Sequence, residues 1–278
     1  MSHPRHYVGP SWPPPVNAYD YVLRLCPSDL AWEFLRRNPR YQRDYWLTRR
    51  GCDHTRRLRN GRHLTRIRRH NLRCIAWGLH PFVDPALPAP YAPLSWVTNP
   101  ATQIIEAISH CPVASSANIL SLADLSSAKH ILVGPTYEQD VLLRDSFHAL
   151  TLRLYGARSF MAPVCASFLI AATPEARHTL PTIATALNLV FQPKHTSDRS
   201  GERLLLRDAV VSLDARCAGA SYRETAALIF GAEYTRAQWG PGKSTWLKER
   251  MRHARAKGEA LRDGGYRKLL QEGCRCSA

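Results

Sequence analysis

Three consecutive segments near the C-terminus repeat apolar residues at helical spacing, and this pattern constrains the fold more than any other feature. The first segment, residues 202–217, carries one apolar stripe and ends before a glycine. The second begins with Ser221 and Glu224, the two residues of a capping box, and ends at Gly231. The third covers residues 245–262. The pattern predicts three packed helices that close the chain.

The third predicted helix is amphipathic in a way that favours a polyanionic ligand. Leu247, Met251 and Ala254 share the side expected to face the other helices. Basic residues repeat along the other sides, and the serine before the helix is the expected N-cap. A helix-turn-helix protein inserts such a helix into the major groove, where phosphate contacts supply much of the affinity. We therefore expect the DNA-contacting residues to be Arg223, Lys243, Ser244, Thr245, Lys248, Arg250, Arg252, Arg255 and Lys257.

The connection before this third helix is about a dozen residues long, whereas a simple helix-turn-helix uses about 3–4. A short helix around Trp239 is expected to fill it. The alternative, a basic amphipathic helix that merely packs at a domain surface, stays open on pattern alone.

The positive charge of the chain is concentrated in two blocks. The net charge is +16, and residues 36–73 contribute +12 of it through fourteen arginines and two aspartates. Residues 243–268 contribute +6, so the remainder of the chain is close to neutral. Two basic blocks around a neutral body are typical of proteins that bind nucleic acids. Solvated basic surfaces are the alternative for either block.

The N-terminal third predicts short helices followed by a linker. Helices are expected from Ala18 and over residues 30–37, and Asn38 with Pro39 marks the start of another. The aromatic residues around these helices are expected to pack in a core. Residues 81–100 contain six prolines, which predicts a linker and a domain boundary.

The middle of the chain predicts strands and then helices. Residues 130–133 and 147–155 have the apolar pattern of strands around a loop. Residues 160–172 form the longest apolar stretch, which is too short to span a membrane and predicts a buried helix, and a second helix is expected at 175–191.

The expected fold class is therefore α+β and mainly α. We expect a small N-terminal helical domain (residues 1–80), a proline-rich linker (81–100), and a second domain (101–278) in which a β-hairpin precedes a helical bundle. The bundle ends in a helix-turn-helix-like unit at residues 202–262.

No signal-peptide pattern opens the sequence, so a cytoplasmic protein associated with the nucleoid is expected. The eight cysteines lack the spacing of metal ligands and predict reduced thiols. We expect no metal and no cofactor.

Two short segments resemble enzyme motifs, but neither has the context that the motif requires. Residues 237–244 approach a phosphate-binding loop, but the residues before them do not predict the buried strand that such a loop needs. His70 and Arg73 have a spacing found in tyrosine recombinases, but they lie in an arginine- and histidine-rich block where it arises by chance. The sequence favours a non-enzymatic protein.

Several motifs resemble a known pair of domains. Residues 19–21 and 30–45 are similar to the transcriptional-regulator-like domain of proteobacterial regulators. Residues 115–272 resemble the RovC-like DNA-binding domain that often follows it, through the two predicted strands and through residues 218–231, Trp239, 247–261 and 264–270. Proteins with this pair are commonly encoded on integrative and conjugative elements, so the resemblance implies an activator of excision and transfer genes.

The expected function is sequence-specific binding of double-stranded DNA by a homo-oligomer, since two-fold assembly matches a palindromic site. RNA polymerase and an anti-activator protein are candidate partners. Two alternatives stay open: a module for RNA or single-stranded nucleic acid that uses the N-terminal arginine block, and an adaptor whose basic helix binds an acidic protein.

Overall fold

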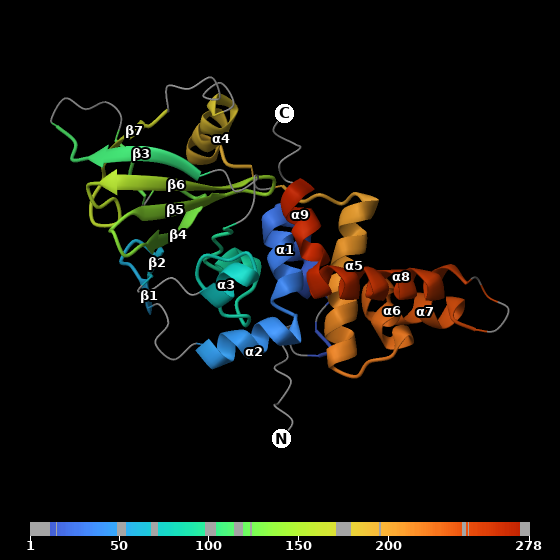
Figure 1. Ribbon diagram of the computed structural model, residues 1–278. Helices are drawn as coiled ribbons and strands as arrows, with labels where there is room; N and C mark the ends of the chain where they lie inside the picture. The colour runs from blue at the N-terminus through green and yellow to red at the C-terminus, as the bar shows by residue number, and fades with distance from the viewer. Residues whose placement is uncertain are drawn as a thin grey trace.

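The computed structural model describes residues 12–14, 16–48, 54–67, 72–97, 104–113, 119–122, 124–170, 179–194, 196–240, 243 and 245–272. Within these residues the fold is α+β, as expected. A mixed sheet lies at one end of the molecule and a group of helices at the other (Figure 1). No helix in the described part of the chain has the length and apolar character needed to cross a bilayer.

Helices occupy both ends of the chain. The N-terminal ones are a 3₁₀ helix η1 (Val16–Arg24), α1 (Pro27–Leu35), α2 (Pro39–Thr48), α3 (Leu72–Ala76) and a 3₁₀ turn η2 (Ala89–Tyr91). The C-terminal ones are α4 (Leu180–Phe191), α5 (Gly201–Cys217), α6 (Tyr222–Phe230), α7 (Ala232–Gln238), α8 (Trp246–Ala260), a π-helical turn η4 (Leu261–Gly265) and α9 (Tyr266–Glu272).

The sheet has seven strands in the described residues. They are β1 (His54–Arg57), β2 (His63–Arg66), β3 (Ile104–His110), β4 (Ala128–Val133), β5 (Gln139–Arg144), β6 (Ala149–Gly156) and β7 (Cys165–Phe168). Their order is β1-β2-β4-β5-β6-β3-β7, with parallel pairing at β2–β4 and β3–β6.

The two predicted strands are confirmed as β4 and β6, but the predicted hairpin is wrong. β5 lies between them and pairs antiparallel with both. Its residues Val141, Leu142 and Leu143 are buried on both faces of the sheet, so they show no alternation that would mark a strand. The arginine block also adds β1 and β2 to the sheet, which joins the two halves of the chain in one element.

The predicted helix at residues 160–172 is wrong for its described part, residues 160–170. These residues contain β7, which pairs antiparallel with β3 from Ala107 to His110. A short apolar run fits a strand or a buried helix equally well. Here it forms a strand because the edge of β3 that does not pair with β6 offers backbone hydrogen-bonding groups to it. The next predicted helix is confirmed as α4 over residues 180–191, whereas residues 171–178 lie outside the described residues.

The proline-rich segment differs from the expected linker because its described part, residues 81–97, packs onto α1 and α2. Val83 and Ala89 are almost completely buried. The indole of Trp32 donates to the Leu87 carbonyl at 2.9 Å, and the Tyr41 hydroxyl donates to the Val83 carbonyl at 2.6 Å. Proline has no backbone N–H, so an extended proline-rich segment buries few unsatisfied donors. We call residues 81–97 the strap.

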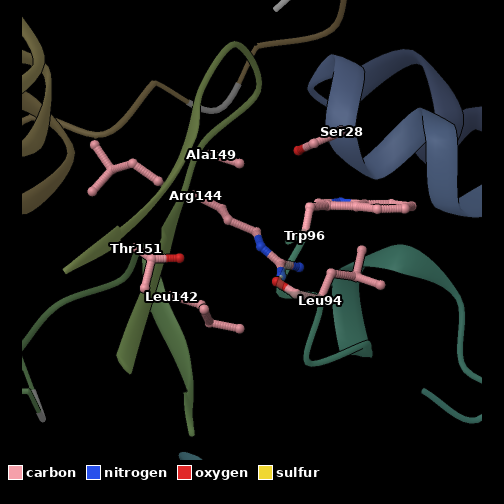
Figure 2. A pocket seen from close by; sticks show the side chains of 8 residues that line it. Ser28, Leu94, Trp96, Leu142, Arg144, Ala149 and Thr151 are labelled. Carbon is pink, nitrogen blue, oxygen red and sulfur yellow. The ribbon is translucent and has the colours of Figure 1, made fainter. Parts of the chain in front are cut away.

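The strap also joins the helices to the sheet. Arg144, at the end of β5, donates hydrogen bonds to the carbonyls of Ala92 and Leu94 at 3.0 and 2.6 Å, and it pairs with Asp29 of α1 at 3.3 Å. Figure 2 shows the Arg144 side chain extending from the sheet toward Leu94 and Trp96. This arginine fixes the position of the sheet against the helical part.

The N-terminal and C-terminal helices share one hydrophobic core. It combines buried residues of η1, α1, α2 and the strap with residues of α5, η4 and α9. A separate N-terminal core was expected, but the N-terminal helices share their core with the last helices of the chain.

The start of α2 is as predicted, because Asn38 Oδ1 accepts hydrogen bonds from the backbone of Arg40 and Tyr41 at 2.8 and 3.3 Å.

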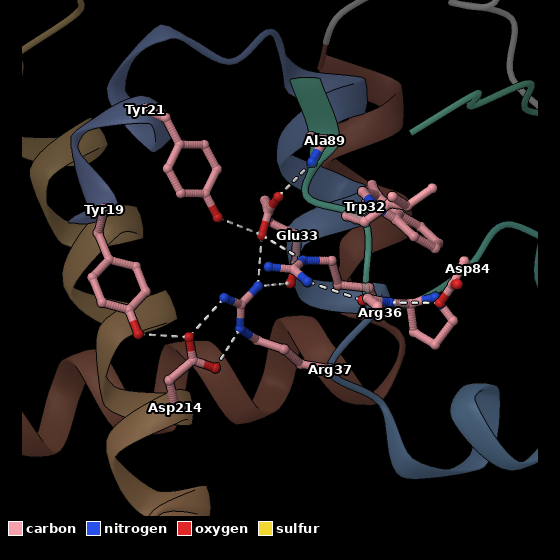
Figure 3. Close-up of polar contacts among 12 residues, drawn as sticks. Tyr19, Tyr21, Trp32, Glu33, Arg36, Arg37, Asp84, Ala89 and Asp214 are labelled. Atoms are coloured by element: carbon pink, nitrogen blue, oxygen red, sulfur yellow. Dashed lines mark hydrogen bonds and ion pairs between the residues drawn. The ribbon is translucent and has the colours of Figure 1, made fainter. Parts of the chain in front are cut away.

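A buried polar network crosses this shared core (Figure 3). Arg37, in the turn that follows α1, lies between Glu33, four residues earlier, and Asp214 of α5. Tyr19 donates to Asp214 at 2.7 Å and Tyr21 donates to Glu33 at 2.9 Å. Buried charges are tolerated because each one has an opposite charge or a hydroxyl donor within reach.

Candidate nucleic-acid interface

Helices α5 to α8 form the unit that was expected to contact DNA, and they lie at the end of the molecule opposite the sheet (Figure 1). The capping box at the start of α6 is confirmed: Glu224 N donates to Ser221 Oγ, and Ser221 N donates to Glu224 Oε2. Gly231 ends α6 with φ +93°, a conformation that favours glycine. The long connection contains α7, and Trp239 is its C-terminal cap residue.

The apolar side of α8 faces the other helices, as predicted. Leu247, Met251 and Ala254 are at most 1 % exposed, and they pack with Ala226 of α6. The helices α5 and α8 approach closely at Gly258, where a Cβ would lie 2.9 Å from the Ala209 carbonyl oxygen. Together these contacts fix the direction in which the other side of α8 points.

The solvent side of α8 carries part of the predicted basic set. Arg252 and Thr245 are exposed, Lys248 and Lys257 are partly exposed, and no carboxylate of the described residues forms an ion pair with these lysines or with Arg252. Glu249 and His253 lie on the same side. Lys243, before the helix, is exposed as well, whereas Ser244 lies outside the described residues. Arg223 is exposed in the first turn of α6.

Arg250 is held by an internal carboxylate. Its Nη2 lies 2.8 Å from Oδ2 of Asp208 on α5, and Arg207 contacts the other oxygen of the same carboxylate at 3.0 Å. Asp208 is 1 % exposed. The guanidinium of Arg250 therefore anchors α8 to α5, which is a different role from the predicted contact with DNA.

Arg255 points into the protein. Only 9 % of the residue is exposed, and its guanidinium carbon lies 3.8 Å from the ring centroid of Tyr222. This is a cation–π contact, which stabilises a desolvated arginine by about 2 kcal/mol. Arg255 continues the helical series of Lys248 and Arg252 at i, i+4 and i+7, but its guanidinium lies over the ring of Tyr222 at the start of α6, so it does not belong to the solvent-facing set.

Sequence reasoning missed an aromatic cluster beside this surface. Phe230 lies 6.5 Å from Tyr234 and 5.7 Å from Trp246 between ring centroids. Tyr234 and Trp246 are 47 % and 51 % exposed. The four-residue spacing of Phe230 and Tyr234 was a visible signal, but Gly231 separates them into two helices and only the fold brings Trp246 to them.

The enzyme motifs gain no supporting geometry. Residues 232–238, which lead into the motif, form helix α7, where a phosphate-binding loop would need a strand. His70 lies outside the described residues, and Arg73 is exposed on α3. Across the described residues, no group of three His, Cys, Asp or Glu side chains is arranged to hold a metal ion.

Comparison with known proteins identifies the two ends of the chain. Residues 14–80 match the model of the proteobacterial transcriptional regulator-like domain. Residues 171–271 match the model of the RovC DNA-binding domain, described as the DNA-binding domain of a T6SS transcription factor. Both resemblances noted from the sequence are confirmed. The second match begins later than the expected 115, so strands β3 to β7 lie outside it. A search of curated proteins finds no match.

Proposed function

We propose, from the pairing of a transcriptional regulator-like domain with a DNA-binding domain, that this chain is a sequence-specific regulator that reads duplex DNA with α8. In this proposal residues 202–262 act as a helix-turn-helix-like unit, with α6 supporting α8. The observation that carries it is the two-sided nature of α8, whose apolar side is fixed against α5 and α6 while Lys248 and Arg252 face solvent.

The residues around α8 divide into two roles. Thr245, Lys248 and Arg252, in or just before the first two turns of α8, are proposed to reach base edges together with Ser244, and the charges of Lys248 and Arg252 are proposed to neutralise adjacent phosphates as well. Lys243, Lys257 and Arg223 are proposed to contact phosphates. We assign Arg250 and Arg255 to positioning, because Asp208 and Tyr222 engage their guanidinium groups.

The domain pair supports a proposal about the cellular role. We propose a cytoplasmic, nucleoid-associated activator of excision or transfer genes of a mobile element that binds its operator as a homo-oligomer. RNA polymerase and an anti-activator protein are the proposed protein partners. We propose that residues 1–80, 81–100 and 101–278 are three functional parts of the chain. They are not three separate cores, because residues of both outer parts contribute to one hydrophobic core.

Genome-wide DNA occupancy of the full chain tests this function. The expected result is a small set of sites that share a motif and lie near transfer genes. A DNA fragment that carries any one of these sites should be retarded by the protein in a mobility-shift assay. Competition then separates the alternatives: excess duplex should displace the operator more strongly than single-stranded RNA of the same length. Occupancy without a shared motif, or stronger competition by RNA, would contradict sequence-specific reading of duplex DNA.

A further inference from the structure

A second basic surface lies at the end of the sheet that points away from α5–α8. The carboxyl ends of β2, β4 and β6 meet there, and Figure 1 shows the arrowhead of β6 pointing away from these helices. A groove of about 610 Å³ opens at this end. We call it the arginine groove; its lining residues are Arg56, Leu64, Arg66, Val133, Tyr137, Gly156, Arg158 and Phe160.

The three arginines of this groove have no carboxylate partner in the part of the chain that the structure describes. Arg56, Arg66 and Arg158 are exposed, and none of them forms an ion pair with an acid of the described residues. Arg36 and Arg37 differ from them although they belong to the same basic block, residues 36–73, as Arg56 and Arg66. Arg36 and Arg37 are buried and both pair with Glu33. Like charges that converge without counter-charges repel one another, and an anionic ligand relieves that repulsion.

Tyr137 contacts two of these arginines through its ring. Its ring centroid lies 5.9 Å from the guanidinium carbon of Arg66 and 5.8 Å from that of Arg158. Tyr137 is 60 % exposed and has φ +67°, an uncommon conformation for an aromatic residue that costs about 1–3 kcal/mol. The turn between β4 and β5 thus places an exposed ring between two cations at the rim of the groove.

We propose that the arginine groove is a second nucleic-acid site, which binds the phosphate backbone of duplex DNA independently of α8. Guanidinium groups recognise phosphate with paired hydrogen bonds, and the exposed Arg59 in the β1–β2 turn extends the basic surface beyond the groove. An extended cationic surface fits a long polyanion. It gives no base readout, so this binding is insensitive to sequence. With α8 at the other end, one molecule contacts two stretches of DNA.

The test isolates this site in a background with α8 inactivated. The binding of full-length Lys248→Glu/Arg252→Glu protein to a fluorescent 20-base-pair duplex of unrelated sequence is measured at several salt concentrations. The substitutions Arg66→Glu/Arg158→Glu are then added to this protein, and the control substitutions Arg40→Glu/Arg43→Glu are added to it separately. The control changes the net charge equally at two exposed arginines of α2. Arg66→Lys/Arg158→Lys tests whether charge alone suffices.

We expect the groove pair of glutamates to weaken duplex binding at least tenfold and to reduce the salt slope by about 2, since each phosphate contact contributes about 0.9. The α2 control should change both far less, and the lysine pair should retain most of the affinity. Equal effects in the groove and α2 variants would overturn the proposal, as would a loss in the lysine pair equal to that of the glutamates. The same groove substitutions are also made in the protein with intact α8, and the binding of these variants to the operator is measured separately. Failure of this proposal is therefore distinguishable from failure of the proposed function of α8.

Discussion

Arg37 and Asp214 lie 177 positions apart in the sequence and form a buried bidentate ion pair, with Nε to Oδ1 and Nη2 to Oδ2 both at 2.7 Å (Figure 3). Arg37 belongs to the part of the chain that matches the regulator-like domain, and Asp214 belongs to the part that matches the DNA-binding domain. The two matched segments are therefore joined by a charge pair in a common core.

Breaking this pair from one side should destabilise the whole protein. Arg37→Met leaves Asp214 buried without its guanidinium partner and leaves Glu33 with Arg36 alone, and we expect a loss of about 3–5 kcal/mol in the free energy of unfolding. Urea unfolding measures it. The control Arg40→Met, at an exposed position of α2, should change stability by less than about 0.5 kcal/mol. Equal effects of the two variants would contradict this account.

Stability should fall with acid through Glu33. Burial alone would raise the pKa of Glu33, but the guanidinium groups of Arg36 and Arg37 outweigh burial and lower it to about 2. A carboxyl whose pKa is depressed on folding stabilises the protein above its unfolded pKa, so this contribution is lost as the pH falls from about 4.5 toward about 2. The pKa of buried Asp29 is raised, which acts in the opposite direction. Urea midpoints across this pH window should decline in the wild type, and more shallowly in Glu33→Gln.

The close approach of α8 to α5 predicts an intolerant glycine. Gly258→Ala would place its Cβ 2.9 Å from the Ala209 carbonyl oxygen and 3.1 Å from Leu213 Cγ. The clash should outweigh the helix propensity of alanine, with a net loss of about 1–3 kcal/mol. Gly201→Ala, where nothing lies within 4 Å, is the control and should not destabilise. Thermal unfolding of the two variants is compared. Equal melting temperatures would contradict this prediction, because they would mean that α5 and α8 can move apart to accommodate the added methyl group without loss of stability.

Arg252 and Arg255 should behave differently although they are three residues apart. Arg252→Met removes an exposed cation and should weaken operator binding and reduce its salt slope by about 1. Arg255→Met fills the same buried space, and it removes two guanidinium nitrogens, Nε and Nη2, that have no hydrogen-bond partner. It should leave DNA affinity within about twofold of the wild type. Mobility shifts at several salt concentrations test the pair. Equal losses in both variants would mean that Arg255 leaves Tyr222 to reach DNA.

Features of the fold that depend on neighbouring residues were predictable. The cap of α2 at Asn38, the capping box at Ser221 and the buried face of α8 at Leu247 all follow from spacing within one helical turn. Such signals are local, and the structure places each where the sequence indicates.

Features that depend on distant contacts were not predictable. The strap at residues 81–97 resembles a linker in composition, and only its contacts with Trp32 and Tyr41 show that it belongs to the core. In the same way, Arg255 and Arg252 look equivalent by spacing until Tyr222 covers one of them. Long-range packing overrides what local pattern suggests at these places.

The central claim, that α8 contacts DNA with its solvent side, is tested most directly by the salt dependence of operator binding. Lys248→Glu/Arg252→Glu is compared with Arg40→Glu/Arg43→Glu, which changes the net charge equally on α2. The account predicts that the α8 variant loses at least tenfold more affinity than the control and about 2 units of salt slope. An α8 variant whose affinity and slope equal those of the control would show that another surface reads the operator.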